Sequence, residues 1–166
     1  MAAPISLVCL VVLNTVLPFT VAQQTQVHFY RESCPQAEFL VRSVVQKWFL
    51  KDKSIAAGLL RLHFHDCFIR GCEASVLIDS TEGNIAEKDA IPNLTLRGFE
   101  LIKALLENKC RGIVSCADIL TLATRDAISL SGGPAYPVPT GRRDGLVSKI
   151  EEVHVKQILA NLTIIQ

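Results

Sequence analysis

The sequence has no excess of charge of either sign and no internal repeat. Its 166 residues carry 17 Lys and Arg against 16 Asp and Glu, which gives a formal net charge of +1. Without a basic field or an acidic tail, the chain is not expected to bind nucleic acid. Apolar residues make up 49% of the chain and charged residues 20%, a composition typical of folded proteins. The length allows one domain, or an incomplete piece of a larger one.

Charged side chains are absent from the first 22 residues. An apolar run there leads to Thr20 and Ala22, small residues suited to the end of a cleavage site. The run is broken by Asn14 and Pro18, and it is short for a membrane span of ~20 residues. We therefore expect a secretory signal peptide over 1–22 rather than a transmembrane anchor.

The cysteines become odd in number once that leader is removed. Five of the 6 remain, and in an oxidising compartment they should pair. One thiol therefore lacks a partner within this chain, so it bonds elsewhere or its partner belongs to sequence that is not present here.

No alternating run is long enough to predict a sheet, whereas apolar residues recur at helical spacing in four stretches. These stretches are 35–50, 54–68, 97–108 and 116–130. Long loops separate them, notably over 70–96. The second stretch is expected to be a heavily buried helix through Ala56, Ala57, Leu59, Leu60 and Phe64. The predicted fold class is all-α.

The second stretch also carries a pair of residues suited to peroxide chemistry. Arg61 and His65 are four residues apart, so on a helix they share a face. A neutral imidazole can move a proton between two peroxide oxygens, and a guanidinium stabilises negative charge as the O–O bond stretches. Neither group is a redox centre, so a haem iron would lie opposite them. A buried helix whose His and Arg satisfy other polar groups would show the same spacing.

His63 does not belong to that face. Two positions along a helix differ by about 200° in direction, so His63 and His65 point to opposite sides. This argues against one metal bound by the two histidines.

Oxygen donors follow in the same segment. Asp66, Glu73 and Ser75 offer side-chain oxygens, and backbone carbonyls are free where the helix ends near Ile69 and Gly71. Such alternating donors on a tight loop are typical of a calcium site. An ordinary acidic turn would have a similar composition.

Taken together, Arg61-Leu62-His63-Phe64-His65-Asp66-Cys67-Phe68, followed by Gly71-Cys72, resembles the distal helix of the secretory plant-type (class III) haem peroxidases. The resemblance continues through the motifs at 87–89, 97–99, 114–118 and 141–144. It implies the distal half of the plant-type peroxidase fold, with an incomplete distal domain over 23–153 and an unmatched tail over 154–166.

The resemblance also implies the catalytic roles. His65 would be the distal acid and base, Arg61 would stabilise the transition state, and Phe64 would restrict access to the iron. Asn93 would accept a hydrogen bond from His65 and keep the imidazole in the tautomer whose free nitrogen faces the peroxide. Since the proximal half follows downstream in the family, no residue of this chain is expected to be the proximal haem ligand.

Calcium and disulfides are implied in the same way. Calcium would be bound by Asp66, Ser75, the carbonyls of Ile69 and Gly71, and the carboxylate of Glu73, with Glu87 nearby through water. The family usually has Asp at position 73, so the longer Glu73 predicts altered geometry or lower affinity. The disulfides would be Cys34–Cys110 and Cys67–Cys72, which leaves Cys116 unpaired.

The expected protein is a secreted monomer of the cell wall or apoplast, or of the vacuole, that responds to oxidative stress. It would use haem b and calcium to reduce hydrogen peroxide and oxidise small phenolic donors, with no membrane partner after signal cleavage. The alternatives are a non-enzymatic secreted calcium-binding fragment held by disulfides, or a mis-spliced product.

Sequons begin at Asn93 and Asn161, and the first is expected to be unmodified because Asn93 would be buried.

Overall fold

The structure is a computed structural model that describes residues 24–106, 110 and 112–156. The predicted signal peptide over 1–22, the sequon at Asn161 and the tail from 157 onward lie outside the described residues. Within the described part, no helix is both long and apolar enough to cross a bilayer.

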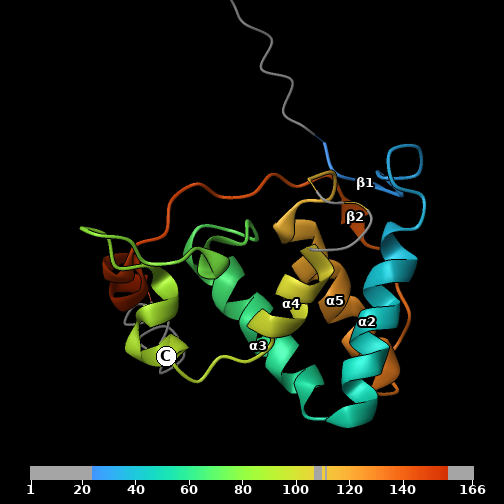
Figure 1. Cartoon of the computed structure of the whole chain (residues 1–166), viewed down its shortest axis with the longest axis horizontal. Coiled ribbons are helices and arrows are strands. Elements are labelled where there is room, and N and C mark those ends of the chain that lie inside the picture. Colours follow the sequence, from blue (N-terminus) through green and yellow to red (C-terminus); the bar gives the residue numbers. More distant parts are fainter. Residues whose placement is uncertain (1–23, 107–109, 111, 157–166) are drawn as a thin grey trace, which may run out of the picture.

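Helices form where the apolar spacing predicts them (Figure 1). They are α2 (Ala37–Lys51), α3 (Ile55–Ile69), α4 (Phe99–Leu106) and α5 (Cys116–Leu130). The prediction of an all-α fold is confirmed, and each helix lies within a few residues of its expected bounds.

Two features of the described chain were not expected. The loop over 70–96 contains short 3-10 helices, which are η1 (Ser75–Leu77), η2 (Glu87–Asp89) and η3 (Ile91–Asn93). An antiparallel pair of two-residue strands, β1 (Gln26–Val27) and β2 (Pro139–Thr140), joins the start of the described chain to the segment after α5. Elements this short leave no periodicity in the sequence.

The hydrophobic core lies where α2, α3 and α4 pack against α5 (Figure 1). Gly98 lets the start of α4 approach α3 closely, because a Cβ atom there would lie 2.9 Å from Cδ2 of Leu59. Its φ of +113° also lies in the region that favours glycine. The core thereby fixes the distance between α3 and the loop that precedes α4.

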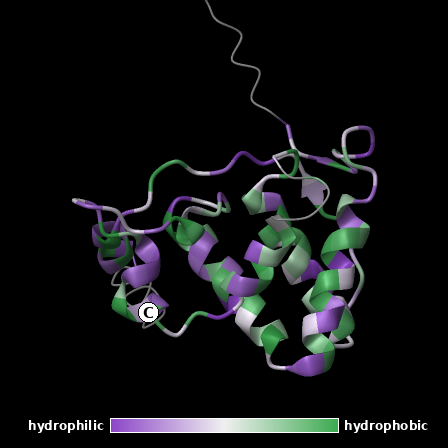
Figure 2. Ribbon diagram, viewed as in Figure 1, coloured by the Kyte–Doolittle hydropathy of each residue, from purple (hydrophilic) through white to green (hydrophobic). Residues whose placement is uncertain are grey.

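The expectation that α3 is heavily buried is wrong for one of its faces. Leu59 is fully buried, whereas Leu60 is 41% and Phe64 61% exposed, and Ala57 is exposed too. Hydrophilic and hydrophobic residues alternate along α2 and α3 in Figure 2, but α3 carries apolar residues on more than the face that meets α5. The sequence pattern shows which residues are apolar, but it does not show which of them pack against another element.

Residues 141–156 run from β2 to the loop after α3 (Figure 1). The backbone N–H of Ile150 donates to the carbonyl of Ile85 at 2.9 Å. Val153 is fully buried against Ile69 and Ala90, within a helical stretch over 150–156. This segment holds the loop that carries η2 and η3 in place.

Candidate functional site

Arg61 lies on α3 and is anchored by the loop before α4. Its Nη1 donates to the hydroxyl oxygen of Thr95 at 2.9 Å, and its Nη2 donates to the carbonyl of Pro92 at 2.8 Å. The guanidinium is therefore fixed next to η3, one helical turn before His65 on the same face of α3.

Asn93 sets the orientation of His65. Its Nδ2 donates to the carbonyl oxygen of Glu87 at 2.6 Å, so its Oδ1 faces Nδ1 of His65, also at 2.6 Å. An amide oxygen only accepts hydrogen bonds, so Nδ1 of His65 carries the proton and Nε2 keeps its lone pair. This is the tautomer that a general base requires.

The pKa of His65 lies below the ordinary value for histidine. Burial is the main cause, the hydrogen bond with Asn93 acts in the opposite direction, and the positive charge of Arg61 lowers the pKa further. The imidazole is therefore neutral at pH 7 and able to accept a proton.

Phe64 lies beside His65 and faces solvent. The two rings meet edge to face with their centroids 5.8 Å apart, and the ring of Phe68 lies 5.5 Å from that of Phe64. With the exposed Leu60, these rings form an apolar surface next to the groups that can transfer a proton. We call it the distal face, defined by Leu60, Phe64, His65 and Phe68.

Asp66 begins a second polar cluster, directed into the protein. It is fully buried and accepts hydrogen bonds from the backbone N–H of Ala74 at 2.9 Å and of Val76 at 3.4 Å. Burial raises the pKa of Asp66 to about 6, and the negative charge of Glu73 contributes to the rise. A buried carboxylate is stable as an anion chiefly when a cation lies beside it.

Ser75 and Glu87 supply unsatisfied oxygens to this cluster. Within the described chain, the hydroxyl of Ser75 and both carboxylate oxygens of Glu87 are buried and make no hydrogen bond of normal geometry, although Ser75 lies near enough to Glu87 to lower the pKa of that carboxyl. Burial raises the pKa of Glu87 to about 7, and the negative charge of Asp66 adds to the effect. Buried polar atoms are normally paired, and oxygens of these kinds are the ligands that Ca²⁺ prefers.

The two carbonyls predicted as calcium ligands already have donors. The carbonyl of Ile69 accepts a hydrogen bond from the ammonium of Lys156, and that of Gly71 accepts one from the backbone N–H of Glu73 at 2.8 Å. Each carbonyl oxygen has a second lone pair that a metal could use. Lys156, however, places a positive charge where a calcium ligand is predicted.

Glu73 is half-buried and lies against Gly145. A Cβ atom at position 145 would lie 2.6 Å from Cδ of Glu73, and the backbone N–H of Gly145 donates to the carbonyl of Glu73 at 2.7 Å. The absence of a side chain at Gly145 therefore gives the longer Glu73 carboxylate room.

The predicted disulfides Cys34–Cys110 and Cys67–Cys72 are confirmed, and Cys116 is a free thiol. Burial raises the pKa of Cys116 to about 12, with a further rise from the negative charge of Asp144. The thiol is therefore protonated and unreactive as a nucleophile.

Comparison with known proteins decides the family. A family model described as peroxidase matches residues 41–161, which include every candidate site residue named above for the distal and calcium clusters. The chain belongs to the peroxidase family. The resemblance to the plant peroxidases that the sequence suggested is thereby confirmed.

Two relatives of this peroxidase chain illustrate the match. It is 53% identical over 148 residues to Peroxidase 28 from Arabidopsis thaliana, which covers 87% of this chain and 46% of the relative. It is 56% identical over 133 residues to Peroxidase 5 from Vitis vinifera, which covers 78% of this chain and 40% of the relative. The chain thus spans about half the length of the curated relatives it matches.

The other histidines of the peroxidase chain have surroundings different from those of His65. His28 lies 3.3 Å from a carboxylate oxygen of Glu38, His63 lies 3.6 Å from the sulfur of Cys67, and His154 is exposed. None of these contacts involves the side chain of His65. That this chain contains no proximal ligand stays a prediction.

Sequence reasoning missed several residues that support the site. Thr95 and the carbonyl of Pro92 hold Arg61, Lys156 reaches Ile69, and the hydroxyl of Ser148 accepts the backbone N–H of Glu87 at 2.9 Å. None of these contacts follows a helical spacing. Thr95 was visible only as the third residue of a sequon.

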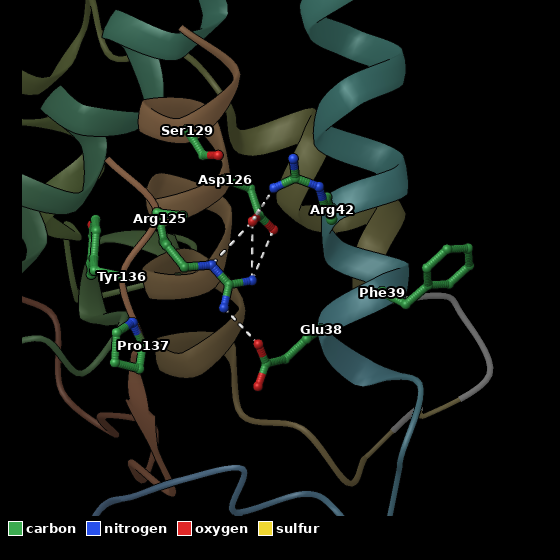
Figure 3. Close-up of a pocket in the computed structure, with 9 residues that line it drawn as sticks. Glu38, Phe39, Arg42, Arg125, Asp126, Ser129, Tyr136 and Pro137 are labelled. Atoms are coloured by element: carbon green, nitrogen blue, oxygen red, sulfur yellow. Dashed lines mark hydrogen bonds and ion pairs between the residues drawn. The ribbon is translucent and has the colours of Figure 1, made fainter. Parts of the chain in front are cut away.

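A pocket of about 410 Å³ lies between α2 and α5, and no predicted site residue lines it (Figure 3). Arg125 donates from Nη1 to a carboxylate oxygen of Glu38 at 2.6 Å, and Nη1 of Arg42 donates to Asp126 at 3.3 Å. Its charged groups are paired with one another. The pocket is therefore lined by ion pairs between α2 and α5, and it shares no residue with the distal face.

Proposed function

We propose that this chain carries the distal half of a haem peroxidase that reduces hydrogen peroxide and oxidises small phenolic donors. The hydrogen bond between Asn93 and Nδ1 of His65 is the observation that carries the proposal. It leaves Nε2 as the basic nitrogen, and a nearby guanidinium, Arg61, is fixed on the same face.

These residues perform the acid–base part of the reaction. Nε2 of His65 accepts the proton from one peroxide oxygen and returns it to the other, which leaves as water. Arg61 stabilises the negative charge that develops on the departing oxygen. Asn93 keeps the imidazole in one tautomer throughout, since its amide oxygen holds the proton on Nδ1.

The distal face fits one wall of a haem site. Phe64 and Phe68 offer exposed aromatic rings beside His65, an apolar surface suited to a flat macrocycle. Bound haem would supply the redox chemistry that no side chain here supplies. Phe64 would limit how closely a bulky donor approaches.

The buried oxygens fit calcium. Asp66, Ser75 and Glu87 offer anionic and neutral oxygens with unused lone pairs, and Ca²⁺ takes six to eight such ligands. The carbonyls of Ile69 and Gly71 and the carboxylate of Glu73 would complete the shell. The ion would stabilise the end of α3, which carries His65.

The test joins this chain to the C-terminal remainder of Peroxidase 28, and compares its reaction with peroxide after haem and calcium are added. His65→Ala and Arg61→Leu should each slow that step by about 10²–10⁴-fold. His28→Ala is the matched control, because His28 pairs with Glu38 and should leave the rate unchanged. Near-normal rates for His65→Ala would refute the role of His65.

The chain on its own is the second sample. A haem titration followed by optical absorption should give weak binding without turnover if the proximal ligand lies outside this sequence. Stoichiometric binding with a histidine-ligated spectrum would contradict that prediction, and the exposed His154 would then be the first residue to replace.

A second candidate function is calcium binding without catalysis. The unsatisfied oxygens of Ser75 and Glu87 favour it, because they need no haem. Calcium should then raise the unfolding temperature of the chain by itself, and Ser75→Ala with Glu87→Gln should remove the effect.

The proposed setting is outside the cytoplasm. The confirmed disulfides Cys34–Cys110 and Cys67–Cys72 favour an oxidising compartment. This supports secretion to the cell wall or apoplast, or delivery to the vacuole. A monomer with a distal domain over 23–153 is part of the same proposal and rests on the family resemblance alone.

A further inference from the structure

Three metal-ligating side chains meet on the side of α3 opposite His65. One ligand atom from each of His63, Cys67 and Cys72 lies within 4.8 Å of the others, and all three residues are half-buried. The proposed peroxidase function uses none of them as a proton donor, an acceptor or a calcium ligand. Two soft sulfur donors and an imidazole are the ligands that zinc prefers.

The helix fixes two of the three donors. His63 and Cys67 are one turn apart on α3, and Nδ1 of His63 lies 3.6 Å from Sγ of Cys67. With Zn–S and Zn–N distances of about 2.3 and 2.0 Å, a tetrahedral zinc site places sulfur and nitrogen about 3.5 Å apart. Nε2 of the same ring lies 3.7 Å from this sulfur, so the sulfur lies beside the ring, and rotation of the His63 side chain would turn one nitrogen toward a shared ion.

The loop holds the third donor without help from the disulfide. Asp66 accepts the backbone N–H of Ala74 at 2.9 Å, and the carbonyl of Glu73 accepts the N–H of Gly145 at 2.7 Å. Cys72 lies directly before these two tethered residues, and its Cα is 4.0 Å from that of Cys67. The loop should therefore stay close to α3 when the sulfur–sulfur bond is broken.

We propose that reduction of the Cys67–Cys72 disulfide creates a zinc site, formed by the two thiolates and the imidazole of His63, with one coordination position left for water. A phosphine and one water molecule convert the disulfide to two thiols and the phosphine oxide. Zn²⁺ then displaces one proton from each thiol. The two thiolates balance the charge of the ion, which makes the bound group neutral.

The charges around the proposed zinc site do not oppose binding of the ion. Arg142, the cation that acts on His63, donates from Nη1 to the carboxylate of Asp118 at 2.9 Å and to the carbonyl of Pro139 at 2.6 Å. Its charge is therefore largely compensated by Asp118. A bound zinc would hold the sulfurs apart and prevent the disulfide from forming again until the metal is removed.

The test uses the full chain, saturated with calcium, reduced with a trialkylphosphine and desalted without oxygen. Co²⁺ is the spectroscopic probe, and Zn²⁺ is then added to displace it. We expect one Co²⁺ per chain with a thiolate-to-cobalt charge-transfer band, and no such band before reduction. Calcium keeps the oxygen cluster occupied, and oxygen ligands would not produce this band.

Matched variants separate this site from the remaining thiols. Cys67→Ser with Cys72→Ser should abolish the band, whereas Cys34→Ser with Cys110→Ser should keep it. His63→Gln should weaken Zn²⁺ binding by at least about tenfold. Equal binding in the Cys67→Ser, Cys72→Ser chain, or unchanged affinity in His63→Gln, would overturn the proposal.

A measurement on the unaltered chain covers the case in which a variant fails to fold. After reduction, Zn²⁺ should protect Cys67 and Cys72, but not Cys34 and Cys110, from alkylation mapped by mass spectrometry. Equal alkylation of all four with and without Zn²⁺ would also overturn the proposal.

Discussion

The amide oxygen of Asn93 lies 2.6 Å from Nδ1 of His65, although the two residues are 28 positions apart in the sequence. The amide cannot rotate without losing the hydrogen bond from its nitrogen to the carbonyl of Glu87. The protonation of His65 is thus fixed by the backbone of η2. The same segment places the side chain of Glu87 in the proposed calcium site.

Replacing the two neighbours of His65 should move its pKa in opposite directions. Asn93→Leu removes a hydrogen bond that raises the pKa, so the pKa should fall further below that of ordinary histidine. Arg61→Leu removes a nearby positive charge, so the pKa should rise, while Arg61→Lys keeps the charge and should change it less. NMR titration of the His65 ring measures both shifts. A shift of the same sign in both variants would contradict the arrangement described above.

The sequon at Asn93 should carry no glycan. The side chain is 2% exposed, and both its oxygen and its nitrogen are occupied, by His65 and by the carbonyl of Glu87. A glycan on Nδ2 would require that segment to unfold. Peptide mapping of the secreted chain should find position 93 unmodified, and a sugar there would refute its place in the site.

The sequence predicted the helices because apolar spacing is a local signal. One helical turn placed Arg61 and His65 on a shared face, but their roles came from the family resemblance. The position of Asn93 came only from the family resemblance, since no spacing rule links η3 to α3. The exposure of Phe64 and the contact of Lys156 could not be predicted, because each depends on which segment packs against α3.

Calcium affinity should fall as the pH drops below about 7, where Glu87 and then Asp66, with a pKa of about 6, become protonated. Without calcium, the pH should act on the folding stability in the opposite direction. Both folded-state pKa values lie above the ordinary values of 3.8 and 4.5, so this contribution to stability is fully present below about pH 4 and is lost as the pH rises to about 7. Urea unfolding at pH 5 and pH 8, with and without calcium, tests both signs. Glu87→Gln should flatten the calcium-free pH dependence, and an unchanged profile would contradict the assignment.

Glu73 and Gly145 should be coupled. Gly145→Ala places a methyl group where the Glu73 carboxyl now lies, so this carboxylate must move and calcium affinity should fall. The shorter side chain of Glu73→Asp vacates that space, so the double variant should bind calcium better than Gly145→Ala alone. Calorimetric titrations of the four chains give the coupling free energy. Additive effects would mean that Glu73 does not use the space beside Gly145.

Lys156 should weaken calcium binding, because its ammonium donates to the carbonyl of Ile69, a predicted calcium ligand. Lys156→Met removes that donor and its charge, and should raise calcium affinity by roughly tenfold at low salt, with a smaller gain at high salt. Lys47→Met on α2 removes the same charge from an exposed site and should have little effect. Lys156→Arg keeps the charge, so this variant should bind calcium about as weakly as the unaltered chain. If Lys156→Met lowered the affinity instead, the segment over 150–156 would be needed to hold the end of α3 for calcium, and the ammonium would be a structural partner of Ile69 rather than a competitor.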